Sequence, residues 1–487
     1  MSRPALGVGL VYWPVLAPLF EAGNDTVGIL ELEPETLWEK VAPRPDHWRY
    51  RVNESLMAQV AGLTQAKLVH GIGHPLGGSV ADPVEHLSLL AGVVDQLDPA
   101  WVSEHLSFNR VRTPRAVQEV GFLLPPAQTA AGVGVAAGNI RNRQRVLRRP
   151  VAFETGVNYL RPRAAEMDDG TFFGAVALAA DAGILLDLHN LWCNERNGRQ
   201  RVSDVLEQLP LDRVWEVHLA GGMPLAGYWL DAHSGLVPEP LMELAADVMA
   251  RLSNVGALLF EILPEHVPTV GLDGVHRQLV ALRQLWDLRP SRTVRVPVQP
   301  HRQSAEQPDS RDVAAVAAWE TALVGALGVP SPGESALAGT LRGDPGIPIF
   351  RQLIGDARRG FLARTMRYTT TALLAGLGGQ QTRELLDSYL ASSPPDAYAA
   401  VEAHQFACFL SERPHVLRRV PYLAEVLEFE HGLVRATIFG QDSELHWTAD
   451  PTAILGALDD GDLPPQLPPA HTRMRIAASA PSRDSRS

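Results

Sequence analysis

Six short apolar runs in the first 265 residues each carry a histidine or carboxylate of a kind that binds metal ions. A short β-rich run bounded by glycine or polar residues is typical of a buried strand. In a parallel barrel, the carboxyl ends of the strands meet around one pocket. The pattern therefore predicts an active site built from strand ends. The runs are KLVHGIG at His70, WVSEHLSF at His105, VAFETG at Glu154, ILLDLHN at Asp187, VWEVHLAG at His218 and ALLFEIL at Glu261.

Three further side chains extend this candidate set. The segment DAHSGLVPEP adds Asp231 and His233, and DLHN adds Asn190. A first-row metal with nitrogen and oxygen ligands takes about six donors at most. Nine donors therefore predict two or three ions, with a carboxylate such as Glu154 or Asp187 as a bridge. Imidazole and carboxylate without clustered thiolates favour iron or manganese over structural zinc and disfavour iron–sulfur clusters.

A structural role is the simpler interpretation for any one of these side chains. A lone histidine or carboxylate at a strand end more often makes a hydrogen bond than binds a metal. Recurrence in six strands changes this balance, because burying so many ionisable groups without a counter-ion is very costly. For His74, His189 and His266 we favour a polar loop role or support of a ligand. Cys193 is expected to be a packed, inert thiol.

The elements that would position these residues alternate between strand and helix patterns, which predicts parallel βαβ units and a TIM (β/α)8 barrel of the α/β class. Amphipathic helical stretches lie between the strand-like runs, and the barrel is expected to close near Trp286. The Gly- and Ala-rich segment Ala127–Asn142 is expected to be a loop over the mouth. The eight strand-like runs are Leu6–Val11, Gly28–Glu33, Lys67–Gly73, Trp101–Leu106, Val151–Thr155, Ile184–Leu188, Val214–Leu219 and Ala257–Leu263.

A length of 487 residues predicts more than one domain. We assign residues 1–288 to the barrel. Residues 289–311 are rich in Pro, Arg, Gln and Ser and predict a linker. Residues 312–462 carry helical periodicity and predict a second, mostly helical domain. Residues 463–487 turn to Pro, Ser, Ala and Arg and are expected to be a disordered tail.

Composition excludes several classes of protein. A formal net charge of −12 argues against a nucleic-acid binder that relies on a broad basic surface. The two cysteines, Cys193 and Cys408, provide no disulfide framework, which fits a reducing compartment. The N-terminal segment lacks the basic start and cleavage site of a signal peptide, and no run reaches the length of a membrane helix. We therefore expect a cytoplasmic protein without membrane or nucleic-acid partners.

Several of these motifs also resemble a known family. The blocks HGIGHPLGGS, VSEHLSF, FETGVNYL, LLDLHN, EVHLAGG, DAHSG and LLFEILPE occur in this order between residues 6 and about 288. They resemble the signature blocks of the multinuclear non-haem iron-dependent oxidative enzymes, the family of the methanobactin-biosynthesis oxidase. The resemblance implies a TIM barrel with two or three irons of mixed Fe(II)/Fe(III) state. It also implies dioxygen as co-substrate and oxidation of cysteine in a ribosomally made precursor peptide.

Carried over residue by residue, the resemblance implies a ligand set that coincides with the candidates above. We expect His70, His105 and Asp231 to take part directly in the reaction. The chain departs from the family pattern at Thr155 and His189, where the family often has Asn. The implied metal ligands are His70, His105, Glu154, Asp187, Asn190, His218, Asp231, His233 and Glu261.

Two other functions remain open on the residues alone. A divalent-metal TIM barrel of the sugar-isomerase or phosphodiester-hydrolase type would polarise a carbonyl or activate water without redox change. Such an enzyme would stay active without oxygen. A non-catalytic peptide or nucleic-acid adaptor would use only the helical domain and would leave the metal-type residues unexplained.

The C-terminal region carries a resemblance of its own. SYLASSPPDAYAAVEAHQFACFLSE and VPYLAEVLEFEHGLVRA look like the small partner protein usually encoded beside these oxidases, which once carried a DNA-binding description. The resemblance covers residues 312 to about 460 and implies recruitment of the precursor peptide. Fusion to the barrel raises the effective concentration of captured peptide, so a separate partner subunit is unnecessary. The acidic charge fits this role better than DNA binding.

Overall fold

A closed barrel of eight parallel strands forms the larger part of the fold in the computed structural model, which describes residues 3–20, 26–44, 47–114, 116–290, 309–328 and 336–478. The predicted TIM barrel is confirmed, and each strand coincides with one of the eight predicted runs to within two residues at either end. Four consecutive strands around the barrel are buried at every position. Around the barrel the strands are β1 (Gly7–Val11), β14 (Ala257–Glu261), β11 (Val214–Ala220), β10 (Gly183–Asp187), β9 (Val151–Glu154), β6 (Val102–His105), β5 (Ala66–Gly71) and β2 (Ile29–Leu32).

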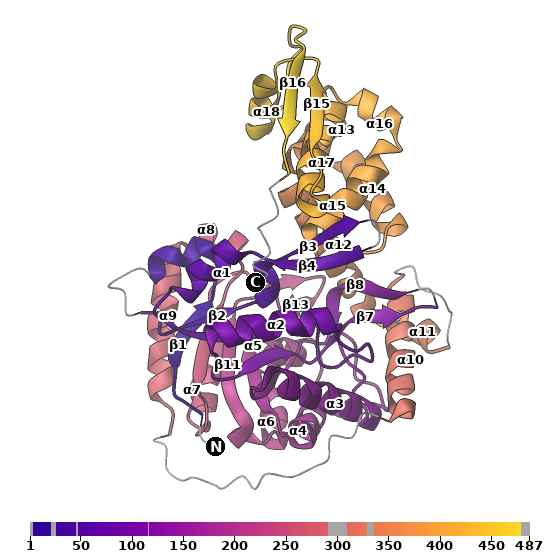
Figure 1. The fold of residues 1–487 in the computed structure, drawn as a ribbon. Coiled ribbons are helices and arrows are strands. Elements are labelled where there is room, and N and C mark those ends of the chain that lie inside the picture. The colour runs from indigo at the N-terminus through magenta and orange to yellow at the C-terminus, as the bar shows by residue number, and fades with distance from the viewer. Residues whose placement is uncertain are drawn as a thin grey trace, which may run out of the picture.

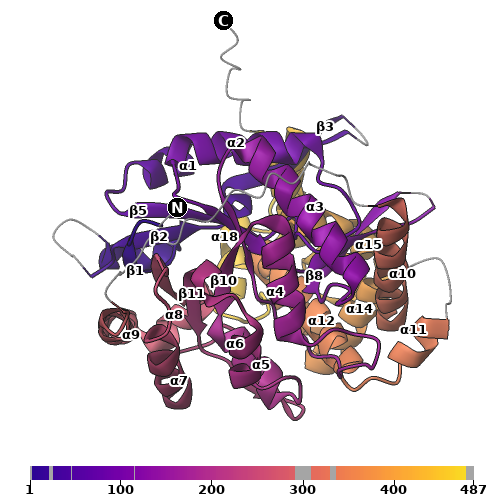
Figure 2. The same ribbon diagram turned by 90° about the horizontal axis from the view of Figure 1, so that it is seen from below.

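Helices surround the barrel, as the view from below shows (Figure 2). They cover the outer face of the strands with their apolar sides, which explains the helical periodicity between the strand runs. Short 3₁₀ turns lie at Pro14–Leu19, Pro34–Leu37, Leu211–Arg213 and Pro264–His266. The helices are α1 (Glu54–Ala61), α2 (Val84–Leu97), α3 (Ala130–Leu147), α4 (Asp169–Ala180), α5 (Leu188–Arg196), α6 (Val202–Gln208), α7 (Glu239–Met249), α8 (Val267–Val270) and α9 (Leu272–Asp287).

The loop expected over Ala127–Asn142 is wrong, because this segment forms most of helix α3. The Thr129 hydroxyl accepts the backbone N–H of Gly132 at 3.2 Å and so caps the helix start. Gly132 lacks a Cβ that would collide with the carbonyl of Ala127, so the glycine serves close packing rather than a turn. The alanines are strong helix formers.

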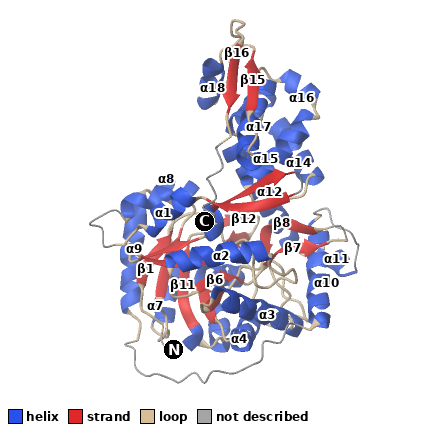
Figure 3. Ribbon diagram, viewed as in Figure 1, coloured by secondary structure: helices blue, strands red, loops and turns tan. Residues whose placement is uncertain are grey.

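Three antiparallel hairpins extend the carboxyl ends of barrel strands β2, β6 and β11. They were not among the predicted elements, because they lie outside the strand–helix alternation. Figure 3 shows them as pairs of strands outside the barrel. The hairpins are β3 (Trp38–Arg44) with β4 (His47–Val52), β7 (Phe108–Arg112) with β8 (Val117–Leu124), and β12 (Met223–Leu225) with β13 (Tyr228–Leu230).

The C-terminal region is mostly helical, as predicted. Residues 346–476 lie on the side of the barrel from which the hairpins rise, whereas residues 310–327 and 336–341 flank the barrel (Figure 1). An apolar core of the C-terminal region extends from Leu362 to Ile476 and also includes Ala42. The elements are α10 (Ser310–Leu327), α11 (Ala336–Leu341), α12 (Gly346–Thr365), α13 (Arg367–Leu377), α14 (Gly379–Ser392), α15 (Ala399–Ser411), α16 (Pro414–Arg419), α17 (Leu423–Phe439), β15 (Ser443–Trp447), α18 (Pro451–Asp459) and β16 (Thr472–Ile476).

The barrel and the C-terminal helices share contacts at two places. Residues of α10 to α12 lie in one apolar cluster with residues of β7, β8 and α3. There the indole N–H of Trp319 donates to the carbonyl of Pro125 at 3.1 Å. On the β3–β4 hairpin, the Lys40 ammonium lies 2.5 Å from the Asp396 carboxylate, and both side chains are largely buried.

The expectation for the C-terminal tail is partly wrong. Residues 472–476 form β16, which pairs antiparallel with β15, because residues of both strands close the C-terminal apolar core. Residues 479–487 lie outside the described residues, as does 291–308 of the expected linker. Within the described ranges, no helix is both long enough and apolar enough to cross a membrane.

Candidate metal centre

The first group of metal-type side chains comes from β5, β6 and β9. The ring nitrogens His70 Nε2 and His105 Nε2 lie 3.2 Å apart. The carboxylate oxygen Glu154 Oε2 lies 3.1 Å from His70 Nε2 and 2.7 Å from His105 Nδ1. The register explains the meeting, because His105 pairs directly with Glu154 across β6 and β9. The Ser103 hydroxyl, 2.9 Å from His70 Nδ1, fixes the orientation of the His70 ring.

A second group comes from β10, β11, β14 and the segment after β13. The His233 Nε2 atom lies 3.0 Å from Asp231 Oδ1 and 3.2 Å from Glu261 Oε2. His218 Nδ1 lies 3.1 Å from Glu261 Oε1. Asp187, His233 and Glu261 can each offer one ligand atom within 4.8 Å of the others.

Asn190 connects the two groups. Its side-chain amide donates to Glu154 Oε1 at 2.9 Å, and its backbone N–H donates to Asp187 Oδ1 at 2.7 Å. Asp187 is the N-cap of α5, so the helix start places Asn190 one turn beyond the strand end. The structure thus brings all nine predicted side chains into one continuous cluster.

The polar atoms of this cluster suit a shared cation. Glu154 Oε2, Asp187 Oδ2, Asn190 Oδ1 and both His218 nitrogens are buried and have no hydrogen-bond partner among the described residues. The short nitrogen–oxygen separations therefore do not follow hydrogen-bond directions. Metal–ligand bonds of about 2.1 Å at right angles would place neighbouring donors about 3 Å apart. This donor chemistry and spacing fit first-row metal ions.

The electrostatics point the same way. Burial and the neighbouring carboxylates of Glu154 and Asp231 raise the pKa of Asp187 well above its usual value. Burial opposes the charged form of His70, yet the carboxylates of Glu31 and Glu154 outweigh it and raise the pKa of His70 to about 10. Protonated imidazoles thus balance the carboxylates when no cation is bound. A metal ion would displace those protons and take over their charge.

Two buried carboxylates that the sequence reasoning missed lie deeper in the barrel. Glu31 Oε1 lies 3.0 Å from His218 Nε2, and Glu216 Oε1 lies 3.7 Å from the same nitrogen. Burial and the charge of Glu216 raise the pKa of Glu31 to about 7. The alternation of strand side chains was a usable signal, because Glu216 lies two residues before His218 and faces the same side.

His189 lies beside Asp231 of the centre, in keeping with the second of the two roles expected for it, the support of a ligand. Its Nδ1 lies 2.9 Å from Asp231 Oδ1, and the Trp229 indole N–H donates to its Nε2 at 3.3 Å. The ring is fully buried. Cys193 Sγ lies 3.6 Å from the same Nε2, and burial raises the pKa of this thiol, so it is packed and protonated as expected. His189 therefore orients Asp231.

A buried ionic network supports the centre from behind β6. The Arg143 guanidinium donates to Glu104 Oε2 at 3.0 Å, to Asp82 Oδ2 at 2.6 Å and to the carbonyl of His74 at 2.7 Å. Glu104 Oε1 accepts the backbone N–H of His105 at 3.1 Å. The network thus anchors the end of β6. His74 is part of it, and His266 lies in a 3₁₀ turn after β14.

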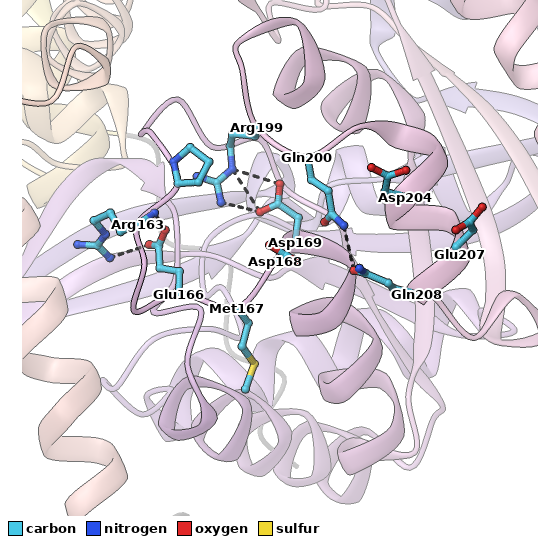
Figure 4. Close-up of a pocket in the computed structure, with 11 residues that line it drawn as sticks. Arg163, Glu166, Met167, Asp168, Asp169, Arg199, Gln200, Asp204, Glu207 and Gln208 are labelled. Carbon is cyan, nitrogen blue, oxygen red and sulfur yellow. Dashed lines mark hydrogen bonds and ion pairs between the residues drawn. The ribbon is translucent and has the colours of Figure 1, made fainter.

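A separate pocket of about 520 Å³ opens beside α4 and α6 (Figure 4). None of the nine predicted residues lines it. Several of its polar side chains are paired with one another. Arg199 binds Asp169, Arg163 binds Glu166, and Gln200 donates to Gln208. This pocket contributes no group to the centre.

A TIM barrel with a buried cluster of imidazoles and carboxylates at its strand ends is typical of metal-dependent barrel enzymes. Residues 8–269 match the family described as RiPP precursor modification enzyme MbnB/TglH/ChrH. The match spans more than half of the chain. The chain belongs to this family.

Individual relatives agree with the family match. The chain is 30% identical over 285 residues to a UPF0276 protein of Streptomyces avermitilis. This alignment covers 57% of this chain and 55% of the relative. It is 34% identical over 184 residues to a UPF0276 protein of Chromobacterium violaceum. This second alignment covers 38% of this chain and 65% of the relative. The chain thus spans less than two thirds of the length of these two relatives.

Two solved structures give distant likenesses. A D-psicose 3-epimerase from Clostridium cellulolyticum H10 aligns with 58% of this chain and 99% of its own, at a TM-score of 0.37 and 12% identity. An L-ribulose 3-epimerase aligns with 59% of this chain and 95% of its own, at a TM-score of 0.37 and 14% identity. Likenesses of this size support no statement about the reaction.

Proposed function

We propose that the barrel is a dioxygen-dependent, multinuclear non-haem iron enzyme that oxidatively modifies cysteine in a ribosomally synthesised precursor peptide. The observation that carries the proposal is the convergence of nine imidazole, carboxylate and amide side chains, five of which have buried polar atoms without a hydrogen-bond partner among the described residues. Nitrogen and oxygen donors without a ligand thiolate suit iron, and the thiol of a substrate would then supply the sulfur ligand. Membership of a family of precursor-peptide modification enzymes supports a peptide substrate.

The two side-chain groups would hold separate ions. His70, His105 and Glu154 would bind one, while Asp187, His233 and Glu261 would bind another. The remaining three predicted ligands, Asn190, His218 and Asp231, lie between or beside these groups. Bound iron would supply electron transfer with dioxygen and would favour the thiolate form of a coordinated peptide cysteine.

The protein side chains would position the reactants and exclude water. Asp231 is held from two sides, by His189 and His233, which lie 2.9 and 3.0 Å from its Oδ1. Although burial alone would raise the pKa of Asp231, these two imidazoles hold it below its usual range, so Asp231 stays ionised. Its role is therefore that of a ligand or charge partner rather than a proton donor. The side chains of His105 and His233 are 19% and 25% exposed, respectively. An entering peptide could therefore reach these two ligands.

The test is anaerobic purification, iron analysis and mass spectrometry of a co-expressed cysteine-containing precursor peptide encoded beside this chain. We expect iron in the purified protein and an oxygen-dependent mass change in the peptide. His105→Ala should abolish the mass change, whereas His276→Ala on the outer helix α9 should not. An unmodified peptide in the presence of fully iron-loaded protein would contradict the proposal. Turnover without oxygen would instead favour a non-redox barrel enzyme.

We also propose that the C-terminal region captures the precursor peptide. The support is its place beside the hairpins that extend the barrel's carboxyl ends, with Tyr50 of β4 and Tyr398 at 5.5 Å between ring centroids. Truncation at residue 289 would expose the apolar cluster shared by α10 and α3, so cross-linking on the full chain is the cleaner experiment. A precursor with a photo-reactive residue in its N-terminal half should label residues 362–476. Labelling confined to the barrel would refute this role.

A further inference from the structure

Two histidines and a cysteine meet in the C-terminal region, far from the barrel in sequence and separate from its centre. His404 and Cys408 lie four residues apart on α15, so both face the same side of the helix. His431 projects from the neighbouring helix α17. His404 Nδ1 lies 2.9 Å from His431 Nε2, and Cys408 Sγ lies 3.9 Å from His404 Nε2.

The spacing of the three side chains suits a tetrahedral ion. Each can offer one ligand atom, and these atoms all lie within 4.8 Å of one another. Metal bonds of about 2.0 Å to nitrogen and 2.3 Å to sulfur would place tetrahedral donors about 3.3 to 3.7 Å apart. Because His404 can offer only one of its two ring nitrogens to the ion, side-chain rotation would bring all three donors to these distances.

The surroundings hold the two rings but leave the thiol open. Phe439 packs edge-on against His404 at 5.0 Å between ring centroids, and Trp48 of the β3–β4 hairpin packs against Phe439 at 6.3 Å. Both histidines are half-buried, whereas Cys408 is exposed. Three protein ligands with one solvent-facing side leave a fourth position free, as in many zinc sites with an exchangeable ligand.

The charge nearby also bears on the choice of ion. Arg435 follows His431 by one turn, and its guanidinium donates to the Ser443 hydroxyl at 3.2 Å. The positive charge of Arg435 would disfavour a metal ion whose ligands were all neutral. The Cys408 thiolate brings a compensating negative charge. One thiolate with two imidazoles favours zinc over the harder ions that oxygen ligands select.

We propose that His404, Cys408 and His431 bind one Zn²⁺ ion, with the fourth position open to solvent. A hydrogen bond between His404 and His431 would by itself explain the short distance between their rings. It would not explain why Cys408 lies one helical turn from His404 on the same face of α15. The site is independent of the iron proposed for the barrel, because it uses a thiolate and none of the barrel residues.

The experiment is titration of the full-length protein with Co²⁺ as a spectroscopic substitute for zinc, in a phosphine reductant without added thiols. We expect tetrahedral ligand-field bands and a thiolate-to-cobalt charge-transfer band that rise and saturate together. The nitrogen and oxygen donors of the barrel can also take up Co²⁺, so the charge-transfer band, and not the total Co²⁺ bound, reports this site. The barrel centre offers no such band, since its proposed ligands are nitrogen and oxygen. Zinc added afterwards should abolish the band by displacement.

Variants test whether the charge-transfer band comes from Cys408 or from another thiol. Cys408→Ser should abolish the charge-transfer band. His431→Gln should weaken Co²⁺ binding about tenfold, which corresponds to about 1.4 kcal/mol of binding free energy. His446→Gln, an exposed histidine of β15, is the matched control and should change neither. The absence of a charge-transfer band in the wild-type protein, or its persistence in Cys408→Ser, would overturn the proposal. The iron content of all four proteins should be equal, which makes failure of the barrel proposal a separate outcome.

Discussion

Arg143 offers the sharpest test of how the barrel supports its centre. The guanidinium is 1% exposed and binds two carboxylates, those of Glu104 and Asp82, whose side chains are 0% and 10% exposed. Arg143→Met keeps most of the side-chain volume but leaves Glu104 without its cation and leaves Asp82 with only the more distant Arg110 guanidinium at 3.5 Å. Removing one partner of a buried ion pair costs about 3–5 kcal/mol, because the other charge stays buried and unpaired. We expect the free energy of unfolding to fall by this amount.

The matched control is Arg149→Met. Arg149 pairs with Asp98, but their side chains are 32% and 77% exposed, so solvent screens the pair. Exposed pairs contribute about 0–1 kcal/mol. Urea unfolding followed by tryptophan fluorescence measures both variants against the wild type.

A second readout links stability to the centre. Glu104 accepts the backbone N–H of His105, so we expect Arg143→Met also to lower the iron content of the purified protein. The double variant Arg143→Met with Glu104→Gln should regain part of the stability, because one uncompensated charge is gone. If Arg143→Met were as stable as Arg149→Met, the reasoning from the buried network would be refuted.

Two further predictions concern single positions. Gly71→Ala would place a Cβ against the buried Glu104 Oε2, and we expect a loss of about 1–3 kcal/mol of unfolding free energy. In the control variant Gly92→Ala the new Cβ meets no atom within 4 Å, so the free energy of unfolding should not fall. Burial raises the pKa of Glu320 to about 7, despite its hydrogen bonds from Ser79, so the folded protein loses stability as pH rises from about 4.5 to 7. The urea midpoint of Glu320→Gln should therefore rise relative to that of the wild type between pH 4.5 and 7. A difference between the two midpoints that does not change with pH would contradict this prediction.

The sequence was sufficient for the barrel because each of its strands is a short apolar run between amphipathic helices. It was also sufficient to collect nine residues that meet in space, since strand ends such as those at His105 and Glu154 must converge once the barrel closes. Their role as ligands stays a prediction. Glu31 and Glu216 were missed although strand alternation places them on the inner face.

Other features could not be read from the sequence for physical reasons. Helix α3 was mistaken for a loop because glycine suggests turns, whereas Gly132 serves a close approach to the Ala127 carbonyl. Strand β16 was missed because its stability depends on pairing with β15 and on the apolar core beneath, not on local composition. The partners of Arg143 lie 39 and 61 residues away, beyond any local pattern.

The most direct measurement of the central claim is anomalous diffraction at the iron absorption edge from crystals of anaerobically purified protein. We predict at least two anomalous peaks, one among His70, His105 and Glu154 and one among Asp187, His233 and Glu261. His105→Ala should lose or weaken the first peak. Crystals of iron-supplemented protein without anomalous peaks among these side chains would contradict the account.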